Sequence, residues 1–484
     1  MVCMKLALIN IEKGEPDPPL RLGYLASYLR KYHGPIDIVI IDNEDFMKRL
    51  KDEKPDLVGI TSVSFQFPAA NKLAEEIKRE LGVPLLIGGH HISMLPSHLA
   101  QSNFDIGVIG EGERTLLELV NLYEKHGEFS KDGLRKINGI VFRNEHDENE
   151  MTPERILIEN LDEVPPPARD LLKMKEFYLN PRKGSFDEIG VYTSLLTSRG
   201  CPYNCAFCSA IGIWKRKYRC FSAEYVINEI KGLLNDYPNL EGIIIWDDLF
   251  IGNRERLRKI ADYIEKEGIN KRLKFTVYAR TNLMNDEVCQ LLKKMNVTVV
   301  DFGLESGSQK ILDYLKKGTL TIEQNKSALK LCKQYGMKTI GTCIIGSPQE
   351  TVEDFQKTRE LVLDDDLDEP YVFQLTPLPG TDVWAYAKSK GIVNDDIGFD
   401  YEQLSIKKFK PNLIMTENVD RKTFEEWFDL LINDASKKRH SVALGGPKIQ
   451  HIKYFFSFAF LKKLRKNYKE YLKYFAKSMS VEKK

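Results

Sequence analysis

Three cysteines stand within eight residues in the stretch GCPYNCAFC: Cys201, Cys205 and Cys208. Thiolates are soft ligands that suit zinc and iron–sulfur clusters. A structural zinc site closes with four protein ligands, and Cys220, twelve residues further on, is the candidate for the fourth. Three thiolates on a four-iron cluster would instead leave one iron open to bind another group. We therefore expect a catalytic iron–sulfur cluster, with a zinc knuckle as the less favoured alternative.

The cysteine loop follows the first of six apolar segments that are typical of β-strands. These segments are VYTSLLTS, GIIIW, KFTVYA, VTVVDFGLE, KTIGTCIIG and YVFQLTPL. Each of the first five is followed by a helical pattern, so the sequence predicts six βα-like units. Such units form a partial (β/α)6 barrel, expected over residues 186–390, with its chemistry at the carboxyl ends of the strands.

Apolar runs also alternate with helical patterns over residues 1–130. The alternation predicts a parallel five-stranded sheet with both faces covered, as in a flavodoxin/Rossmann-like doubly wound α/β domain. A ligand of such a domain binds at the carboxyl ends of the strands. Residues 131–185 are expected to be a linker with a hairpin and the Pro-rich stretch LDEVPPPARD. Residues 391–484 are expected to form a mainly helical C-terminal region.

The stretch CPYNCAFC matches the C-x3-C-x2-C signature of the radical S-adenosylmethionine (SAM) enzymes. The segments WDDLF, FGLESGSQKILDYLKKG, GTCIIGSPQET and TPLPGT resemble the later motifs of that family, in order. The resemblance implies a [4Fe-4S] cluster whose open iron binds SAM. It also implies reductive cleavage of SAM to a 5′-deoxyadenosyl radical, which abstracts hydrogen from an unactivated C–H bond. The SAM contacts that it implies are Phe207, Asp247, Asp248, Glu305, Ser306, Ile345, Gly346 and Pro348.

The chemistry of these residues agrees with the implied contacts. An amino group favours a carboxylate such as Asp247 or Asp248, and ribose hydroxyls favour an acceptor such as Glu305. Adenine suits a glycine-flattened backbone edge beside apolar residues. Taken alone, the Asp pair could cap the next helix, and residues 346–348 could form only a turn. Their joint order behind the cysteine loop favours the SAM interpretation.

Segments of the first 130 residues resemble the cobalamin-binding domain that precedes the barrel in a large subclass of radical SAM enzymes. The segments are PPLRLGYLASYLRKY, PDLVGITSVSFQF, VPLLIGGHHISMLPSHL and FDIGVIGEGERTLLELV. The implied cobalamin contacts are Pro19, Leu20, Ser62, Ser64, Gly89, His90, Glu111 and Gly112. The stretch DNEDFM after the second strand lacks the histidine of the D-x-H-x-x-G motif, and His90 or His91 is a weak candidate for an axial ligand. A domain of this type that binds no cobalamin is the alternative.

The composition sets limits on partners and location. The formal net charge of +1 gives no overall field that would favour nucleic acid, so we expect no nucleic-acid partner. Eight cysteines in 484 residues are not a disulfide scaffold. The sequence shows no signal-length apolar run near its start and no apolar stretch of about 18 residues. A cytoplasmic protein is expected.

The segment 451–484 has ten Lys/Arg residues against two Glu residues, with nine interleaved aromatic residues. Aromatic residues beside a basic face favour an interfacial helix on an anionic membrane, and with it a lipid-like substrate. A terminal helix that packs its aromatic residues on the barrel is the preferred alternative. Peripheral membrane contact therefore stays one of two interpretations of this segment.

The leading hypothesis is an oxygen-sensitive, cobalamin-dependent radical SAM methyltransferase that acts on an unactivated carbon of a small-molecule or lipid-like substrate. Its expected cofactors are the [4Fe-4S] cluster, SAM and cobalamin, with flavodoxin or ferredoxin as external electron donor. A radical cyclase, ring-contracting or oxidative enzyme with the same two domains is the rival. A cluster- or cobalamin-carrying electron-transfer protein is the alternative from another class. The sequence assigns no catalytic residue and no specific substrate.

Overall fold

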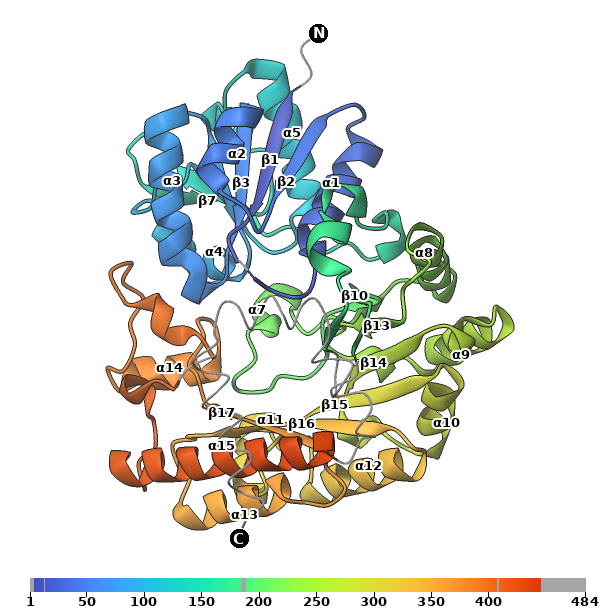
Figure 1. The fold of residues 1–484 in the computed structure, drawn as a ribbon. Helices are drawn as coiled ribbons and strands as arrows, with labels where there is room; N and C mark the ends of the chain where they lie inside the picture. Colours follow the sequence, from blue (N-terminus) through green and yellow to red (C-terminus); the bar gives the residue numbers. More distant parts are fainter. Residues whose placement is uncertain (1–3, 13, 184–188, 407–408, 445–484) are drawn as a thin grey trace, which may run out of the picture.

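The computed structural model describes residues 4–12, 14–183, 189–406 and 409–444. Two large sheets dominate the chain, and Figure 1 shows the sheet of the first domain above the sheet of the second. The expected fold class is confirmed: a doubly wound α/β domain, a partial barrel and a helical C-terminal region follow one another. The basic aromatic segment 451–484 lies outside the described residues. Among the described residues, no helix is long and apolar enough to cross a membrane.

The first sheet has seven strands. They are β1 (Lys5–Asn10), β2 (Asp37–Ile41), β3 (Leu57–Thr61), β4 (Leu85–Gly88), β5 (Ile106–Val108), β6 (Ile140–Arg143) and β7 (Asn149–Met151). Their order in the sheet is β2-β1-β3-β4-β5-β6-β7, and the first five are parallel, as expected for a doubly wound domain. The hairpin of β6 and β7 is antiparallel and extends this sheet, so that part of segment 131–185 packs with the first domain.

Helices cover both faces of the first sheet. They are α1 (Leu20–Tyr32), α2 (Phe46–Glu53), α3 (Phe67–Leu81), α4 (His90–Met94), α5 (Glu113–His126) and α6 (Lys131–Leu134). Successive side chains of a strand point to opposite faces, so Leu6 and Leu8 pack with α1 and α5, whereas Ala7 and Ile9 pack with α2 and α3. This burial on both faces explains the continuous apolar runs in the sequence.

The second sheet contains all six strands expected from the sequence, all parallel and in chain order. They are β10 (Tyr192–Leu195), β13 (Gly242–Ile245), β14 (Lys274–Ala279), β15 (Val297–Glu305), β16 (Lys338–Ile345) and β17 (Glu369–Gln374). The helices of this part are α8 (Ala223–Asp236), α9 (Arg254–Lys266), α10 (Asp286–Lys294), α11 (Gln309–Lys316), α12 (Ile322–Gln334), α13 (Val352–Val362) and α14 (Asp382–Ser389). The short pair β8 (Arg182–Lys183) and β9 (Ile189–Gly190) precedes β10.

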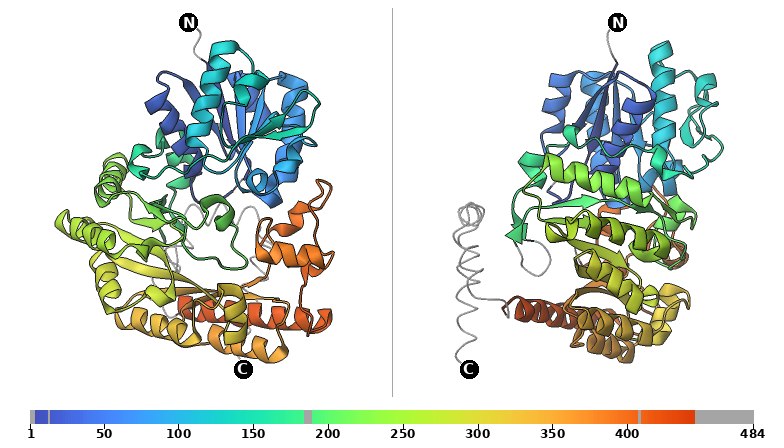
Figure 2. Two further views of the ribbon diagram at one scale, coloured as in Figure 1. Left: turned by 180° about the vertical axis from the view of Figure 1, so that it is seen from behind. Right: turned by 90° about the vertical axis from the view of Figure 1, so that its right-hand side faces the viewer.

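The long C-terminal helix α15 (Arg421–Leu444) packs along β17, the edge strand of the barrel sheet. An uncovered edge strand would present a row of unpaired backbone groups, and a packed helix protects it. Figure 1 and the left view of Figure 2 place this helix, in red, on the side of the barrel away from the first domain.

A buried cluster of four charged side chains ties the first domain to the barrel. Glu111 and Glu113 flank the start of α5, and Arg199 and Arg219 face each other across the antiparallel pair β11 (Ser198–Arg199) and β12 (Arg219–Cys220). Arg199 donates to Glu111 at 2.9 Å and to Glu113 at 2.6 Å, and Arg219 donates to Glu111 at 3.0 Å. Burial alone would raise the pKa of Glu111, but the two arginines lower it. All four side chains are buried away from water.

A second contact between the domains is apolar. The Met94 side chain at the end of α4 lies against Gly212 and Gly380 of the second domain. A Cβ atom on either glycine would approach the Met94 sulfur to 2.2 or 2.4 Å, closer than atoms pack. A larger residue at either glycine would therefore require the flexible end of the Met94 side chain to move.

We predict that Glu111→Gln lowers the free energy of unfolding by about 3–5 kcal/mol, because it leaves two buried guanidinium groups with one carboxylate. The matched control is Glu163→Gln, which removes the exposed pair with Arg114 and should cost less than about 1 kcal/mol. Urea unfolding of both variants measures the difference. Equal losses in the two variants would contradict the role of the cluster.

Candidate active site

The loop that carries the three cysteines is fixed at its base and at its middle. At the base, β11 pairs with β12, and the short helix α7 (Ala210–Trp214) lies between them in the chain. In the middle, the N–H of Ala206 donates to the carbonyl of Leu315 at 2.8 Å, and the Ala206 carbonyl accepts from the N–H of Val383 at 3.2 Å. The loop is thus held by the ends of α11 and α14, on the barrel side of the domain boundary.

Burial raises the pKa of the Cys201 thiol and raises that of Cys208 to about 11, so both thiols are protonated until a metal displaces the proton. The described residues include no group of three His, Cys, Asp or Glu side chains close enough to hold a single ion. The thiols of a four-iron cluster bind three different irons and so stand further apart than ligands of one ion. Cys220 lies elsewhere, beside Tyr218 and Arg256, which gives the zinc knuckle no support.

Arg280, at the carboxyl end of β14, is a functional candidate that the sequence did not indicate. Its guanidinium lies 3.6 Å from the sulfur of Cys205, stacks at 3.7 Å on the ring of Tyr203 and donates to Thr319. These contacts fix the Arg280 side chain beside the cysteine loop. Its position directly after an apolar strand was the available signal, because barrel chemistry gathers at strand ends.

The structure separates the adjacent carboxylates Asp247 and Asp248. Asp247 is buried and accepts hydrogen bonds from the Thr197 N–H at 2.6 Å, from the Thr197 hydroxyl and from Ser198 at 2.7 Å. It therefore anchors the chain that enters the cysteine loop. Asp248 is exposed, and its charge acts on Cys201 and Cys208. Partial burial, then the neighbouring Asp247, raises the pKa of Asp248.

Glu305 ends β15 in a left-handed conformation, with a φ of 61°, and its side chain is 3% exposed. One carboxylate oxygen forms an ion pair with Lys316 at 2.6 Å, while the other is buried without a hydrogen-bond partner. The Lys316 ammonium also lies 5.5 Å from the centre of the Phe207 ring, which places Phe207 beside the same pair. A buried oxygen without a hydrogen-bond partner is costly unless a ligand donates to it, so this oxygen of Glu305 is a candidate acceptor for a ligand.

Ser306 points away from such a role, because its hydroxyl contacts the Thr358 hydroxyl at 3.0 Å and accepts from the Ser308 N–H at 3.1 Å. It fixes the turn after β15 to α13.

The segment 345–348 forms the turn after β16. Gly346 has a φ of 105°, and its N–H and that of Ser347 both donate to the buried carboxyl of Glu350, at 2.6 and 2.9 Å. The Ile345 carbonyl accepts from Leu375, and the Pro348 carbonyl accepts from Glu417. These backbone groups of the turn are therefore engaged within the protein, whereas the buried hydroxyl of Ser347 has no hydrogen-bond partner among the described residues.

Five of the expected cobalamin contacts lie at the carboxyl edge of the first sheet. Gly89 has a φ of 102°, and a Cβ atom there would lie 2.5 Å from the Ser62 carbonyl, so these two loops touch. Arg21 follows Pro19 and Leu20 at the start of α1 and is close enough to His90 for its charge to lower the pKa of that imidazole, after the larger effect of burial. A Cβ atom on Gly88 or Gly110 would meet open space, as a bulky ligand at this edge would require.

Ser64 is held in a buried hydrogen-bond chain. Its hydroxyl lies 3.3 Å from His91 Nδ1, His91 Nε2 lies 3.0 Å from His98 Nδ1, and His98 Nε2 lies 2.8 Å from the Asp395 carbonyl. Both ring nitrogens of His91 are engaged, so it has none left for an axial ligand.

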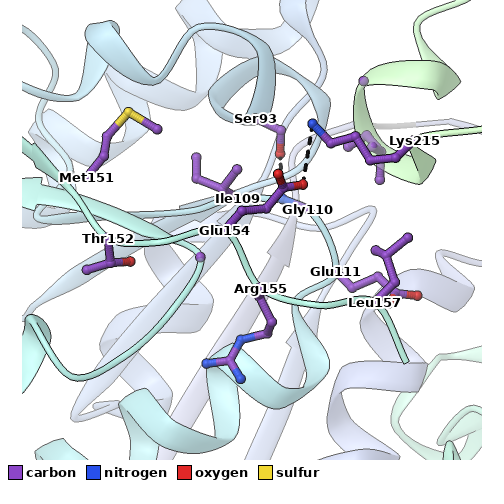
Figure 3. Close-up of a pocket in the computed structure, with 13 residues that line it drawn as sticks. Ser93, Ile109, Gly110, Glu111, Met151, Thr152, Glu154, Arg155, Leu157 and Lys215 are labelled. Atoms are coloured by element: carbon purple, nitrogen blue, oxygen red, sulfur yellow. Dashed lines mark hydrogen bonds and ion pairs between the residues drawn. The ribbon is translucent and has the colours of Figure 1, made fainter. Parts of the chain in front are cut away.

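Glu111 and Gly112 differ from the other expected contacts. The Glu111 carboxylate accepts hydrogen bonds from Arg199, Arg219 and the Ile158 N–H, and Gly112 packs against Leu25. Both belong to the domain junction. A recess of about 190 Å³ lies here between the β5 end, the exit of the hairpin and α7, where Figure 3 shows Glu154 paired with Lys215. It is smaller than the pockets that hold organic cofactors.

Sequence comparisons agree with this geometry. The radical SAM superfamily model matches residues 195–362, and the B12 binding domain model matches residues 8–120. An uncharacterized methyltransferase from Pyrococcus horikoshii is 34% identical over 392 residues, covering 78% of this chain and 80% of the relative. The chain belongs to the radical SAM superfamily. It is a radical SAM enzyme with an N-terminal B12 binding domain.

Other relatives share both domains. An anaerobic magnesium-protoporphyrin IX monomethyl ester cyclase from Rubrivivax gelatinosus is 29% identical, covering 80% of this chain and 68% of the cyclase. The structure of the radical SAM methyltransferase TsrM from Kitasatospora setae, with cobalamin and a [4Fe-4S] cluster bound, superposes with a TM-score of 0.64. It is 20% identical and covers 80% of this chain and 76% of TsrM, which shows a common fold.

The radical SAM domain brings a [4Fe-4S] cluster and SAM to this enzyme, and the B12 binding domain brings cobalamin. The residues present fit these groups. Three cysteines share one anchored loop, Glu305 offers an unsatisfied buried oxygen, and Gly88 and Gly110 leave space at the edge of the first sheet.

Burial raises the pKa of Glu350 to about 8, although the N–H groups of Gly346 and Ser347 act in the opposite direction. The folded protein therefore holds a proton that the unfolded chain releases above about pH 4.5, and stability is lost as the pH rises toward 8. We predict that raising the pH from 6 to 8 destabilises the wild type by about 2–3 kcal/mol more than Glu350→Gln. Urea unfolding at both pH values measures this, and parallel losses would contradict a buried neutral carboxyl.

Proposed function

We propose that this radical SAM enzyme methylates an unactivated carbon of a small-molecule substrate, with cobalamin as methyl carrier. The observation that carries the proposal is the junction of the two domains. The Arg199–Glu111 contact and the Met94 contact hold the carboxyl edge of the first sheet against the segment that bears the cysteines. The relative from Pyrococcus horikoshii, a methyltransferase by name, supports the same reaction class.

The chemistry that the bound groups supply is the reductive cleavage of SAM and the carriage of a methyl group. The residues of the chain bind and orient these groups. Cys201, Cys205 and Cys208 would hold the cluster, at which SAM would bind. The exposed carboxylate of Asp248 accepts the SAM amino group, and the orphaned oxygen of Glu305 accepts from the ribose hydroxyls.

The reduced cluster requires an electron from outside the chain, and flavodoxin or ferredoxin is the donor class that we propose. A radical cyclase is the second candidate function, because the Rubrivivax gelatinosus relative with that name covers both domains. The two functions differ in the fate of the SAM methyl group, since methylation consumes it and cyclisation does not.

Anaerobic reconstitution with iron, sulfide and hydroxocobalamin, followed by SAM and dithionite, tests the proposal. We expect close to one cobalt per chain and formation of both 5′-deoxyadenosine and S-adenosylhomocysteine. Formation of 5′-deoxyadenosine without S-adenosylhomocysteine would favour the cyclase. The absence of both products would overturn the assignment of a radical SAM function. The control is a variant with Cys201, Cys205 and Cys208 changed to Ala, which should lose its iron and both products.

The separation of the two carboxylates gives a sharper prediction. Asp248→Asn should weaken SAM binding about tenfold or more, because it removes a charge-assisted hydrogen bond worth about 1.5–3 kcal/mol. The matched variant Asp247→Asn should instead lower the urea midpoint, because Asp247 anchors Thr197 and Ser198. Equilibrium dialysis of SAM against each reconstituted variant separates the roles. Weaker SAM binding only in the Asp247 variant would reverse the assignment.

A further inference from the structure

Three neighbouring strands of the barrel place a row of polar and aromatic side chains on its inner face. Tyr278 of β14 and Asp301 of β15 are paired in register, so their side chains lie next to each other. Trp246 directly follows β13, and its ring stacks on Tyr278 with 5.0 Å between the centroids and 24° between the planes. On β15 the flanking residues Val300 and Phe302 are fully buried on the opposite, helix-covered face.

This row lies one layer below the residues that surround the cysteine loop. Trp246 and Asp248 come after the end of β13, and Arg280 comes directly after β14, two residues after Tyr278. Arg280 reaches Cys205, and the charge of Asp248 acts on Cys201. A molecule that contacts the row is therefore adjacent to the end of the barrel where SAM is expected.

The row is accessible and chemically unsatisfied. The Trp246 side chain is 45% exposed, although its ring is stacked on Tyr278. The Asp301 carboxylate is half-buried and has no hydrogen bond or ion pair with any described residue, whereas Glu305 on the same strand is paired with Lys316. Burial, then the charges of Glu305 and Glu369, raises the pKa of Asp301 to about 7. A cation bound nearby would stabilise the carboxylate of Asp301 and lower its pKa again.

Most of the charges that act on the row are negative. The negative charge of Glu369 acts on Asp301, and that of Asp17 in the first domain acts on Tyr278. The cations near the row have other partners: Lys316 pairs with Glu305, Arg439 stacks on Tyr371 at 4.5 Å, and Arg280 lies against Tyr203 and Cys205. An anionic substrate would therefore be repelled here. A cation would be attracted both by Asp301 and by the faces of the aromatic rings.

We propose, resting on the proposed function above, that the substrate joins a planar unsaturated ring to a protonated amine. The ring packs on the exposed face of the Trp246–Tyr278 pair, and the amine binds the carboxylate of Asp301. Asp301 and Trp246 then determine specificity, and the substrate carbon that reacts lies toward Asp248 and Arg280, one layer above.

Three probes of similar size test this assignment: 2-naphthylmethylammonium, 2-naphthylacetate and (decahydro-2-naphthyl)methylammonium. They are titrated calorimetrically into the anaerobically reconstituted full chain with SAM present. We expect the naphthyl cation to bind at least tenfold more tightly than the naphthyl anion, which lacks the positive charge, and than the decahydronaphthyl cation, which lacks the flat ring. Equal binding of the three probes, tighter binding of the anion, or no binding would overturn the proposal.

Variants locate the site. Asp301→Asn should remove the preference for the naphthyl cation over the anion, and Trp246→Leu should remove the preference for the flat ring. Asp262→Asn, which removes an exposed carboxylate on the outer helix α9, is the control and should change neither preference. A charge preference that persists in Asp301→Asn would also overturn the proposal. Formation of both 5′-deoxyadenosine and S-adenosylhomocysteine by the wild type tests the proposed function separately, so failure of one is distinguishable from failure of the other.

Discussion

The structure depends on the buried ion cluster formed by Arg199, Arg219, Glu111 and Glu113. Four charges removed from water are tolerated only with good mutual geometry, so the cluster specifies one arrangement of its two sides. One side is the end of β5 in the B12 binding domain, and the other is the strand pair that closes the cysteine loop. Arg199 stands two residues before Cys201. The position of the cysteines is thereby coupled to the first domain.

The remaining contacts extend this constraint from the cluster to the SAM end of the barrel. Arg256 donates to the carbonyl groups of Thr197 and Phe221, and Asp247 accepts from Thr197, so both strands at the base of the loop are fixed from the barrel. These groups form hydrogen bonds only within the protein. By contrast, Asp301 has no hydrogen bond with any described residue, and one oxygen of Glu305 is buried without one. The difference between satisfied and unsatisfied carboxylates is therefore the clearest indication of function in this chain.

The sequence predicted the regular part of the structure well, because buried strands require apolar runs and helices require their own periodicity. It could not separate Asp247 from Asp248, since adjacent strand residues point to opposite sides and only the fold shows which side is filled. It could not show that Glu111 joins the ion cluster, because its partners Arg199 and Arg219 stand 88 and 108 residues away. Arg280 and Asp301 were missed for a similar reason: their importance lies in neighbours brought by other strands.

The central claim is that the ion cluster holds the metal centres of the two domains in one fixed arrangement. The most direct measurement is the electron paramagnetic resonance spectrum of the enzyme with cob(II)alamin in the first domain and a reduced cluster in the barrel. The account predicts magnetic coupling between the two centres in the wild type and its loss or broadening when Arg199 is replaced by Leu. Two independent signals in the wild type, or unchanged coupling in the variant, would contradict it.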